Sequence, residues 1–198
     1  MKIIVVGAPG SGKTLFCINW CEYLGSTRIY YNEFNIAGKR KGMISPPAAR
    51  EKMVQNGCSQ AARTFIVNRP GKSPPRLTLI DTFSLQGKAE LNIFERKKLF
   101  FTLEMLAEAD VILNLVDLSC NDPPKMEFAA EVDRCLFDFS IRHPVHYILV
   151  GNKLDLLENH KEVLWWSAGR MATVVSAKKR IGFDRLTEQI AGLGGLTA

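Results

Sequence analysis

A glycine-rich segment near the amino terminus has the residue types and spacing of a phosphate-binding loop. Residues 7–14 read Gly-Ala-Pro-Gly-Ser-Gly-Lys-Thr, which fits G-x-x-x-x-G-K-[ST] between an apolar run and a segment with helical spacing. Glycines allow consecutive backbone N–H groups to point at an anion, and the N-terminus of a following helix adds a positive dipole end. The residues predicted to contact a nucleotide here are Gly7, Pro9, Gly10, Ser11, Gly12, Lys13, Thr14 and Leu15.

Two side chains of this segment suit the charged end of a nucleoside triphosphate. Lys13 is expected to bridge the β- and γ-phosphates, and the Thr14 hydroxyl is expected to ligate Mg²⁺. Asp81, which ends an apolar run further along, is expected to hold the same Mg²⁺, usually through water. The alternative is an aspartate that only caps the following turn. Because such a loop serves ATP and GTP equally, the base must be identified from other residues.

A polar tetrapeptide, Asn-Lys-Leu-Asp at residues 152–155, suits the recognition of guanine. The Asp155 carboxylate can accept from the N1–H and the 2-amino group of guanine. Adenine offers neither donor, so a site built on these bonds rejects it. Asn152 is expected to fix the loop, the Lys153 stem to lie along the purine ring, and the Ala177 backbone N–H to reach guanine O6. The residues predicted to contact the base are Asn152, Lys153, Asp155, Ser176, Ala177 and Lys178.

Apolar runs alternate with helix-like segments, and each motif follows an apolar run. This order predicts one α/β domain over residues 1–198, with a mainly parallel sheet and helices on both faces. Ligands then bind outside the carboxyl ends of the strands. The segment at about 25–76, which is rich in turn signals, is predicted to be the least regular part. Strands are predicted at Lys2–Val6, 64–67 (paired with 77–80), Arg76–Asp81, 111–116, 146–150 and 173–175, and helices at Lys13–Tyr23, 91–107, 127–141 and 183–190.

In order and position, these segments resemble the first, third, fourth and fifth sequence motifs of the Ras-like small GTP-binding proteins. The chain is more similar to bacterial GTPases of the Era, TrmE and FeoB kind than to eukaryotic Ras proteins. The resemblance implies a G domain with a six-stranded sheet, GTP, GDP and Mg²⁺ as ligands, and a switch I-type insert at about 25–76. It further implies a GTPase that acts as a molecular switch together with a protein effector or activating partner.

The chain departs from this family pattern after Asp81. The family has Asp-x-x-Gly, and the chain reads Asp-Thr-Phe-Ser. Ser84 retains a backbone N–H for the γ-phosphate, but its side chain restricts the backbone. The water-orienting glutamine of the family corresponds to Leu85, with Gln86 one residue later. Since Leu85 cannot polarise water, hydrolysis is predicted to be slow or to depend on a partner. The candidate catalytic groups are Lys13, the Ser84 backbone N–H and Gln86.

A second departure concerns the switch I threonine, whose hydroxyl contacts Mg²⁺ in the GTP state of the family. Residues 60–63 read Gln-Ala-Ala-Arg and resemble the bacterial Gln-Thr-Thr-Arg, so both threonines would be alanines. Ser59 and Thr64 flank the gap, and either one is a candidate Mg²⁺ ligand. Loss of this ligand would weaken the GTP-bound state.

The composition places limits on location and partners. The 198-residue chain has a net charge of +6 and five cysteines without metal-ligand spacing. With no signal peptide and no apolar stretch of membrane length, it is expected to be cytoplasmic and not transmembrane. The positive net charge is compatible with nucleic acid or an anionic surface as a partner. It is equally compatible with scattered charges that serve solubility. Two alternatives to the switch follow: a nucleotide-binding interaction module with little or no hydrolysis, and an RNA- or ribosome-associated GTPase.

Overall fold

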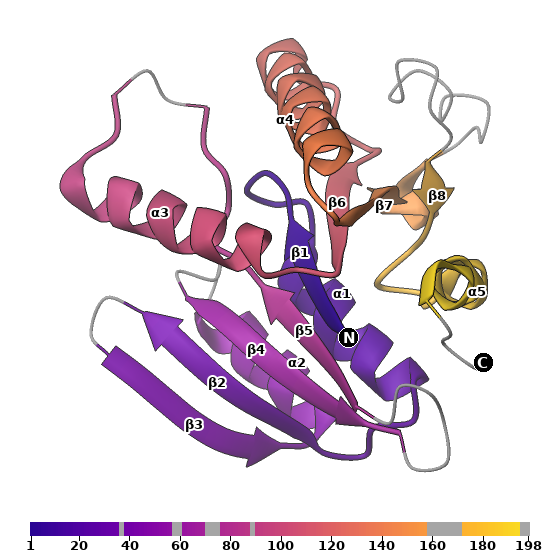
Figure 1. Cartoon of the computed structure of the whole chain (residues 1–198). Helices are drawn as coiled ribbons and strands as arrows, with labels where there is room; N and C mark the ends of the chain where they lie inside the picture. Colours follow the sequence, from indigo (N-terminus) through magenta and orange to yellow (C-terminus); the bar gives the residue numbers. More distant parts are fainter. Residues whose placement is uncertain (36–37, 57–60, 70–75, 88–89, 158–171, 195–198) are drawn as a thin grey trace.

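Figure 1 shows the computed structural model, which describes residues 1–35, 38–56, 61–69, 76–87, 90–157 and 172–194. Within these residues, one eight-stranded sheet has the strand order β3-β2-β4-β5-β1-β6-β7-β8. Its strands are β1 (Lys2–Val6), β2 (Ile29–Asn35), β3 (Gly38–Ile44), β4 (Ala62–Asn68), β5 (Arg76–Asp81), β6 (Val111–Asp117), β7 (His146–Asn152) and β8 (Thr173–Val174). The helices are α1 (Lys13–Tyr23), α2 (Pro46–Asn56), α3 (Ile93–Ala107), α4 (Pro123–Arg142) and α5 (Phe183–Gly194), with a 3₁₀ helix η1 (Leu154–Leu156).

The larger part of the sheet is parallel and carries the motif-bearing strand ends. β5, β1, β6, β7 and β8 run in one direction. Val5 of β1 pairs with Asp81 of β5 on one side and with Leu113 of β6 on the other. β7 pairs with β6 up to Asn152. The carboxyl ends of these strands therefore lie at one edge, where open α/β sheets bind ligands. The predicted mainly parallel sheet is confirmed.

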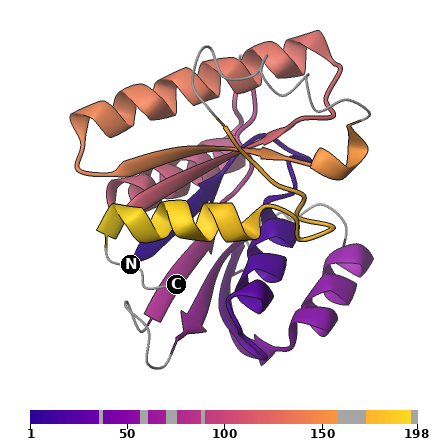
Figure 2. The same ribbon diagram turned by 90° about the vertical axis from the view of Figure 1, so that its right-hand side faces the viewer.

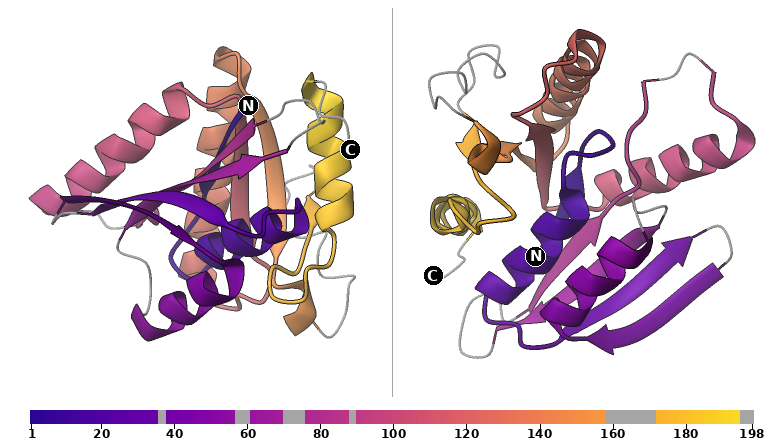
Figure 3. Two further views of the ribbon diagram at one scale, coloured as in Figure 1. Left: turned by 90° about the horizontal axis from the view of Figure 1, so that it is seen from below. Right: turned by 180° about the vertical axis from the view of Figure 1, so that it is seen from behind.

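Side chains of β1 alternate between two apolar cores on opposite faces of the sheet. Ile3 and Val5 pack with side chains of α1, α2 and α5. Ile4 and Val6 pack with side chains of α3 and α4. Figures 2 and 3 show the same division of the helices about the sheet. Both faces of a central parallel strand must be covered in this way, which is why its sequence is continuously apolar. The prediction of helices on both faces is confirmed.

Helix α1 joins the phosphate-loop segment to the rest of the core. The Phe16 ring lies 5.4 Å from the Trp20 ring and 5.5 Å from the Phe183 ring of α5, centroid to centroid. All three side chains are fully or almost fully buried. These contacts fix the helix whose first turn presents Lys13 and Thr14. No helix in the described ranges has both the length and the apolar character needed to span a bilayer.

The expected six strands are a wrong count, because the described residues form eight. The additional pairing comes from the segment at 25–76, where β2 pairs antiparallel with both β3 and β4, and α2 follows β3. The basic run Lys39–Lys41 lies exposed on β3, the outermost strand, so it shows no apolar alternation that would reveal a strand. Exposed lysines are typical of sheet edges because they oppose pairing with other chains. The predicted pairing of 64–67 with 77–80 is confirmed, with Thr64 opposite Ile80.

We expect the turn into α5 to require glycine at position 182. Gly182 has φ +78°, and a Cβ there would lie 2.2 Å from the carbonyl oxygen of Val174. Gly182→Ala should therefore lower the free energy of unfolding by about 2 kcal/mol or more, measured by urea denaturation. Gly192→Ala is the control, since that site in α5 has nothing within 4 Å and alanine should raise stability by about 0.5–1 kcal/mol. Equal effects of the two substitutions would contradict the turn geometry.

Candidate functional site

The phosphate-loop segment, residues 7–12, connects β1 to α1 in the order that the motif requires. Gly12 is the N-terminal cap of α1 and has φ +92°. A Cβ on Gly12 would lie 2.5 Å from the Asn152 side-chain nitrogen, so glycine here permits the close approach of the loop after β7. The first four N–H groups of a helix lack intrahelical acceptors. Together with the positive dipole end, they make this loop suited to an anion.

The Lys13 ammonium lies within the loop. It is almost completely buried and donates to the carbonyl oxygens of Gly7 (2.9 Å) and Ala8 (3.1 Å). It also donates to the hydroxyl of Ser84 at 2.9 Å. The predicted phosphate ligand and the predicted catalytic segment after β5 are thus brought together. Pro9 and Gly10 form the exposed tip of the loop.

A carboxylate and a hydroxyl meet beside this ammonium. Asp81 at the end of β5 has no exposed surface, and one of its oxygens accepts from the Thr14 hydroxyl at 2.7 Å. Its other oxygen has no hydrogen-bond partner among the described residues. Burial raises the pKa of the Asp81 carboxyl, although the Thr14 hydrogen bond and the charges of Lys13 and Arg63 oppose this shift. An orphaned carboxylate oxygen beside a hydroxyl fits Mg²⁺, which prefers oxygen ligands.

The described residues contain no cluster of three or more His, Cys, Asp or Glu side chains able to hold a metal ion. If Asp81 and Thr14 hold Mg²⁺, phosphate oxygens and water would supply its remaining ligands, as is usual for this ion. The protein ligands present fit a metal that arrives together with a nucleotide.

An arginine that the sequence reasoning missed as a site residue lies near the same carboxylate. Arg63 in β4 pairs in register with Asp81, and its Nη1 is 3.8 Å from the Asp81 carboxylate. Its Nε donates to the buried Glu33 of β2 at 2.9 Å. The signal was available in the predicted pairing of 64–67 with 77–80, because one further step along it places residue 63 opposite residue 81.

The structure does not bring Thr64 to Thr14 and Asp81. Thr64 follows Arg63 in β4 and pairs with Ile80, which belongs to the core beneath α3 and α4. Successive side chains of a strand point to opposite faces, so Thr64 lies on the other face of the sheet from Arg63. The other candidate Mg²⁺ ligand, Ser59, lies outside the described residues.

The residues predicted to contact the base adjoin the phosphate loop. The Asn152 side chain donates to the Ser11 carbonyl oxygen at 2.8 Å and accepts from the Ala177 N–H at 2.9 Å. The Asp155 carboxylate accepts from the Ser176 hydroxyl. One buried amide thus ties the phosphate loop to the 176–178 loop, as expected for a residue that fixes this region. Lys178 is exposed next to them.

Lys153 is held by a second residue that sequence reasoning missed. It adopts φ +68°, and its ammonium donates to the Asp117 carboxylate at 2.6 Å. Asp117 ends β6, and its other oxygen accepts from the backbone N–H and the hydroxyl of Ser119. The available signal was an acid at the end of an apolar strand, the same pattern that identified Asp81. The Lys153 ammonium is thereby fixed at the end of β6.

The segment after Asp81 contacts the phosphate loop and also lines a largely apolar cavity. The Leu85 N–H donates to the Gly7 carbonyl oxygen at 3.2 Å, so the segment runs along the phosphate loop. Leu85 and the exposed Gln86 both help to line a cavity of about 210 Å³ between α3 and α4, with Leu99 and Phe128 among the other lining residues. The leucine therefore has an apolar environment beside the phosphate loop.

The sequence of the chain is similar to that of a curated protein. No protein-family model matches the chain. Over 167 residues it is 27% identical to the tRNA modification GTPase MnmE of Acinetobacter baylyi, an alignment that covers 81% of the chain and 34% of MnmE. The chain thus spans about a third of the length of this curated relative.

Solved structures extend the likeness to the whole chain. Era of Aquifex aeolicus bound to GDP and AlF₄⁻ matches with a TM-score of 0.61 at 17% identity, covering 100% of the chain and 57% of Era. Era in complex with MgGDPNP and a 16S ribosomal RNA fragment matches with a TM-score of 0.59 at 18% identity over the same shares. At these identities the structural likeness establishes the fold. The chain therefore has the fold of the Era G domain, and its sequence is similar to part of MnmE.

Proposed function

We propose that the chain binds GTP and GDP at the parallel-strand edge and acts as a molecular switch that hydrolyses GTP with Mg²⁺. The single observation that carries this proposal is the buried Asn152 amide. It is hydrogen-bonded to Ser11 of the phosphate loop and to Ala177 of the 176–178 loop, which is called the base loop below. A polyphosphate and a purine can therefore be held by one connected structure. The relationship to MnmE and the Era complexes with guanine nucleotides support the same assignment.

The choice of guanine rests on Asp155. Its carboxylate is an acceptor for the N1–H and the 2-amino group of guanine, and the Ser176 hydroxyl orients it. With adenine, the carboxylate would face an acceptor and lose both bonds, and a site that leaves a polar group unpaired in this way discriminates strongly. Lys153, held by Asp117, is placed to cover a face of the ring with its aliphatic stem.

The phosphates and the metal are assigned to the opposite end of the site. Lys13 and the N-terminus of α1 would hold the phosphates, and Thr14 and Asp81 would hold Mg²⁺. A bound Mg²⁺ ion neutralises charge on the β- and γ-phosphates. In this role, phosphate oxygens would replace some of the acceptors that hold the Lys13 ammonium within the loop, which are the carbonyl oxygens of Gly7 and Ala8 and the Ser84 hydroxyl.

Hydrolysis is proposed to be slow or to require a partner. Leu85 has no group that could orient water and contributes instead to the apolar cavity between α3 and α4. Gln86 is exposed and would have to turn toward the γ-phosphate to act. These features keep open the alternative of a binding module with little turnover. The site itself supplies the Lys13 ammonium and the Ser84 N–H.

Two proposals concern partners and location. The net charge of +6 and the Era complex with a 16S ribosomal RNA fragment favour an RNA- or ribosome-associated GTPase as the second candidate function. A protein effector or activating partner would read the nucleotide state in a cytoplasmic switch. Filter binding to ribosomal RNA over a range of salt concentrations tests the RNA-associated function. Contacts with RNA phosphates predict an affinity that falls steeply with salt, and absent binding would favour a switch that is read by a protein partner.

We expect nucleotide binding to depend on Asp155 through the base. Wild-type protein should bind GDP and GTP at least about 100-fold more tightly than ADP and ATP, measured by calorimetry with Mg²⁺. Asp155→Asn should weaken GDP binding by about tenfold or more, because the amide nitrogen would face the donors of guanine. Asp138→Asn, at an exposed site on α4, should leave the affinity unchanged. Equal binding of ATP and GTP would refute the guanine assignment.

We expect the metal effect on nucleotide binding to depend on Asp81. In the wild type, chelation of Mg²⁺ should speed the release of a fluorescent GDP by about tenfold or more, because the metal bridges protein and phosphates. Asp81→Asn keeps an acceptor for the Thr14 hydroxyl but removes the anionic metal ligand, so release should be fast with or without Mg²⁺. Asp138→Asn, which changes an exposed carboxylate on α4, is the control. A full Mg²⁺ effect in Asp81→Asn would exclude this metal site.

We expect single-turnover hydrolysis of bound GTP to be slow in the wild type and faster by about tenfold or more in Leu85→Gln, because the amide can position water. Leu91→Gln introduces the same side chain at another residue that lines the cavity and should not accelerate the reaction. Brisk wild-type turnover would exclude the binding-module alternative, and no gain in Leu85→Gln would show that Leu85 does not limit the rate.

A further inference from the structure

The backbone of the 176–178 loop is held from both sides. The Ala177 N–H donates to Asn152, and the Ala177 carbonyl oxygen accepts from the Asn19 side-chain nitrogen of α1 at 2.7 Å. Asn19 and Ala177 are each only 2% exposed. A buried residue whose backbone N–H and carbonyl oxygen are both hydrogen-bonded has little freedom to shift. The position of Asn19 therefore bears directly on the loop that carries Ser176, the residue that orients Asp155.

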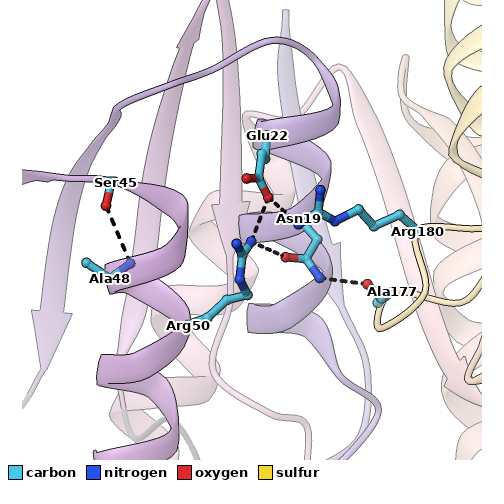
Figure 4. Close-up of polar contacts among 7 residues, drawn as sticks. All are labelled: Asn19, Glu22, Ser45, Ala48, Arg50, Ala177 and Arg180. Atoms are coloured by element: carbon cyan, nitrogen blue, oxygen red, sulfur yellow. Dashed lines mark hydrogen bonds and ion pairs between the residues drawn. The ribbon is translucent and has the colours of Figure 1, made fainter.

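The orientation of the Asn19 amide depends in turn on Arg50 of α2. Arg50 donates through Nη1 to the Asn19 side-chain oxygen at 2.8 Å. An amide offers donors on its nitrogen and acceptors on its oxygen. It can donate to Ala177 while buried only if its oxygen faces another donor. Figure 4 shows Asn19 between the two, with its oxygen toward Arg50 and its nitrogen toward Ala177.

A second chain of contacts runs from Arg50 through Glu22 to Arg180, at the other end of the loop. Arg50 donates to the Glu22 carboxylate of α1 at 2.6 Å, and Arg180 contacts the same carboxylate oxygen at 2.6 Å. The Arg50 hydrogen bond holds the pKa of Glu22 below its usual value. Arg180 has φ +60° and precedes Ile181, which forms a bridge with Ser176. One carboxylate therefore links α2 to the end of the loop (Figure 4).

Both chains of contacts begin on α2, which lies outside the recognised motifs. Helix α2 lies in the segment expected to be the switch I-type insert, and Ala49 and Met53 place it against the core beside α1. We propose that Arg50 is a positioning residue for guanine recognition, acting through Asn19 and Glu22 on the 176–180 loop. The proposal rests on the guanine-binding function proposed above. It adds that the docking of α2 and the affinity for the base are coupled, in both directions.

The loss of Arg50 should weaken the binding of the guanine base and leave the binding of the phosphates unchanged. Arg50→Ala leaves the Asn19 oxygen buried without its donor and removes the contact that joins α2 to Glu22, while the Glu22–Arg180 ion pair remains. We expect GDP affinity to fall about tenfold, the size associated with losing a charged hydrogen bond. The affinity for inorganic pyrophosphate, which occupies only the phosphate loop, should change by less than about twofold. Both constants are measured by calorimetry with Mg²⁺ present.

Two matched variants test the specificity of this effect. Lys52→Ala removes a cation from the same helix, where the ammonium lies 5.3 Å from the Tyr31 ring centroid, and should change neither affinity. Arg50→Lys should recover part of the GDP affinity, because a single nitrogen of Arg50 makes both contacts. Equal losses for GDP and pyrophosphate, or no loss of either, would overturn the positioning role. Failure of the wild type to bind GDP would instead refute the proposed function.

A measurement on the wild type covers the case in which Arg50→Ala does not fold. Coupling requires guanine nucleotide to stabilise the docked state of α2. Hydrogen exchange of α2 amides should therefore slow several-fold on addition of saturating GDP, whereas saturating pyrophosphate should leave it unchanged. Exchange in α2 that does not respond to GDP, or responds equally to both ligands, would overturn the inference.

Discussion

The buried amide of Asn152 is the interaction on which the arrangement of the site depends. Its nitrogen and oxygen are both engaged, one with the Ser11 carbonyl oxygen and the other with the Ala177 N–H. The phosphate loop and the base loop are nearly the whole chain length apart in sequence, and this side chain joins them. The close approach needs glycine at position 12. Because an unpaired amide in this place would be strongly unfavourable, the two loops are fixed as a unit.

The two ends of the site differ in how completely they are built. At the base end, Asp155, Lys153 and Ala177 are each held by a named partner. At the γ-phosphate end, Leu85 contributes to an apolar cavity and Gln86 is exposed. Binding can rely on a prearranged structure, whereas fast hydrolysis would need preorganised groups at the γ-phosphate, and Leu85 and Gln86 do not supply them. This contrast is the physical basis for proposing firm binding and slow, partner-dependent turnover.

The segment from β2 to β4 contributes more than a flexible connection. Its strands extend the sheet, and Arg63 and Glu33 bring a charge pair beside the buried Asp81. Its helix brings Arg50 against α1. An element expected to respond to the γ-phosphate thus contacts the proposed metal ligand Asp81 through Arg63 and, through Arg50, the α1 residues that reach the 176–180 loop. Such a connection gives one route by which a change in the insert could alter nucleotide affinity.

Local sequence determined the parts of this protein that depend on neighbouring residues. The phosphate loop, the strand-ending Asp81 and the 152–155 tetrapeptide were predicted because each motif is continuous in the chain. Pairings between distant segments determined the rest. The β2–β3 hairpin was missed since an exposed, basic edge strand carries no apolar alternation. The contact of Arg63 with Asp81 follows from strand register, which the predicted pairing of 64–67 with 77–80 already implied. The contact of Arg50 with Asn19 arises only when helix docking brings remote side chains together. Tertiary packing alone makes that choice, because no local spacing encodes it.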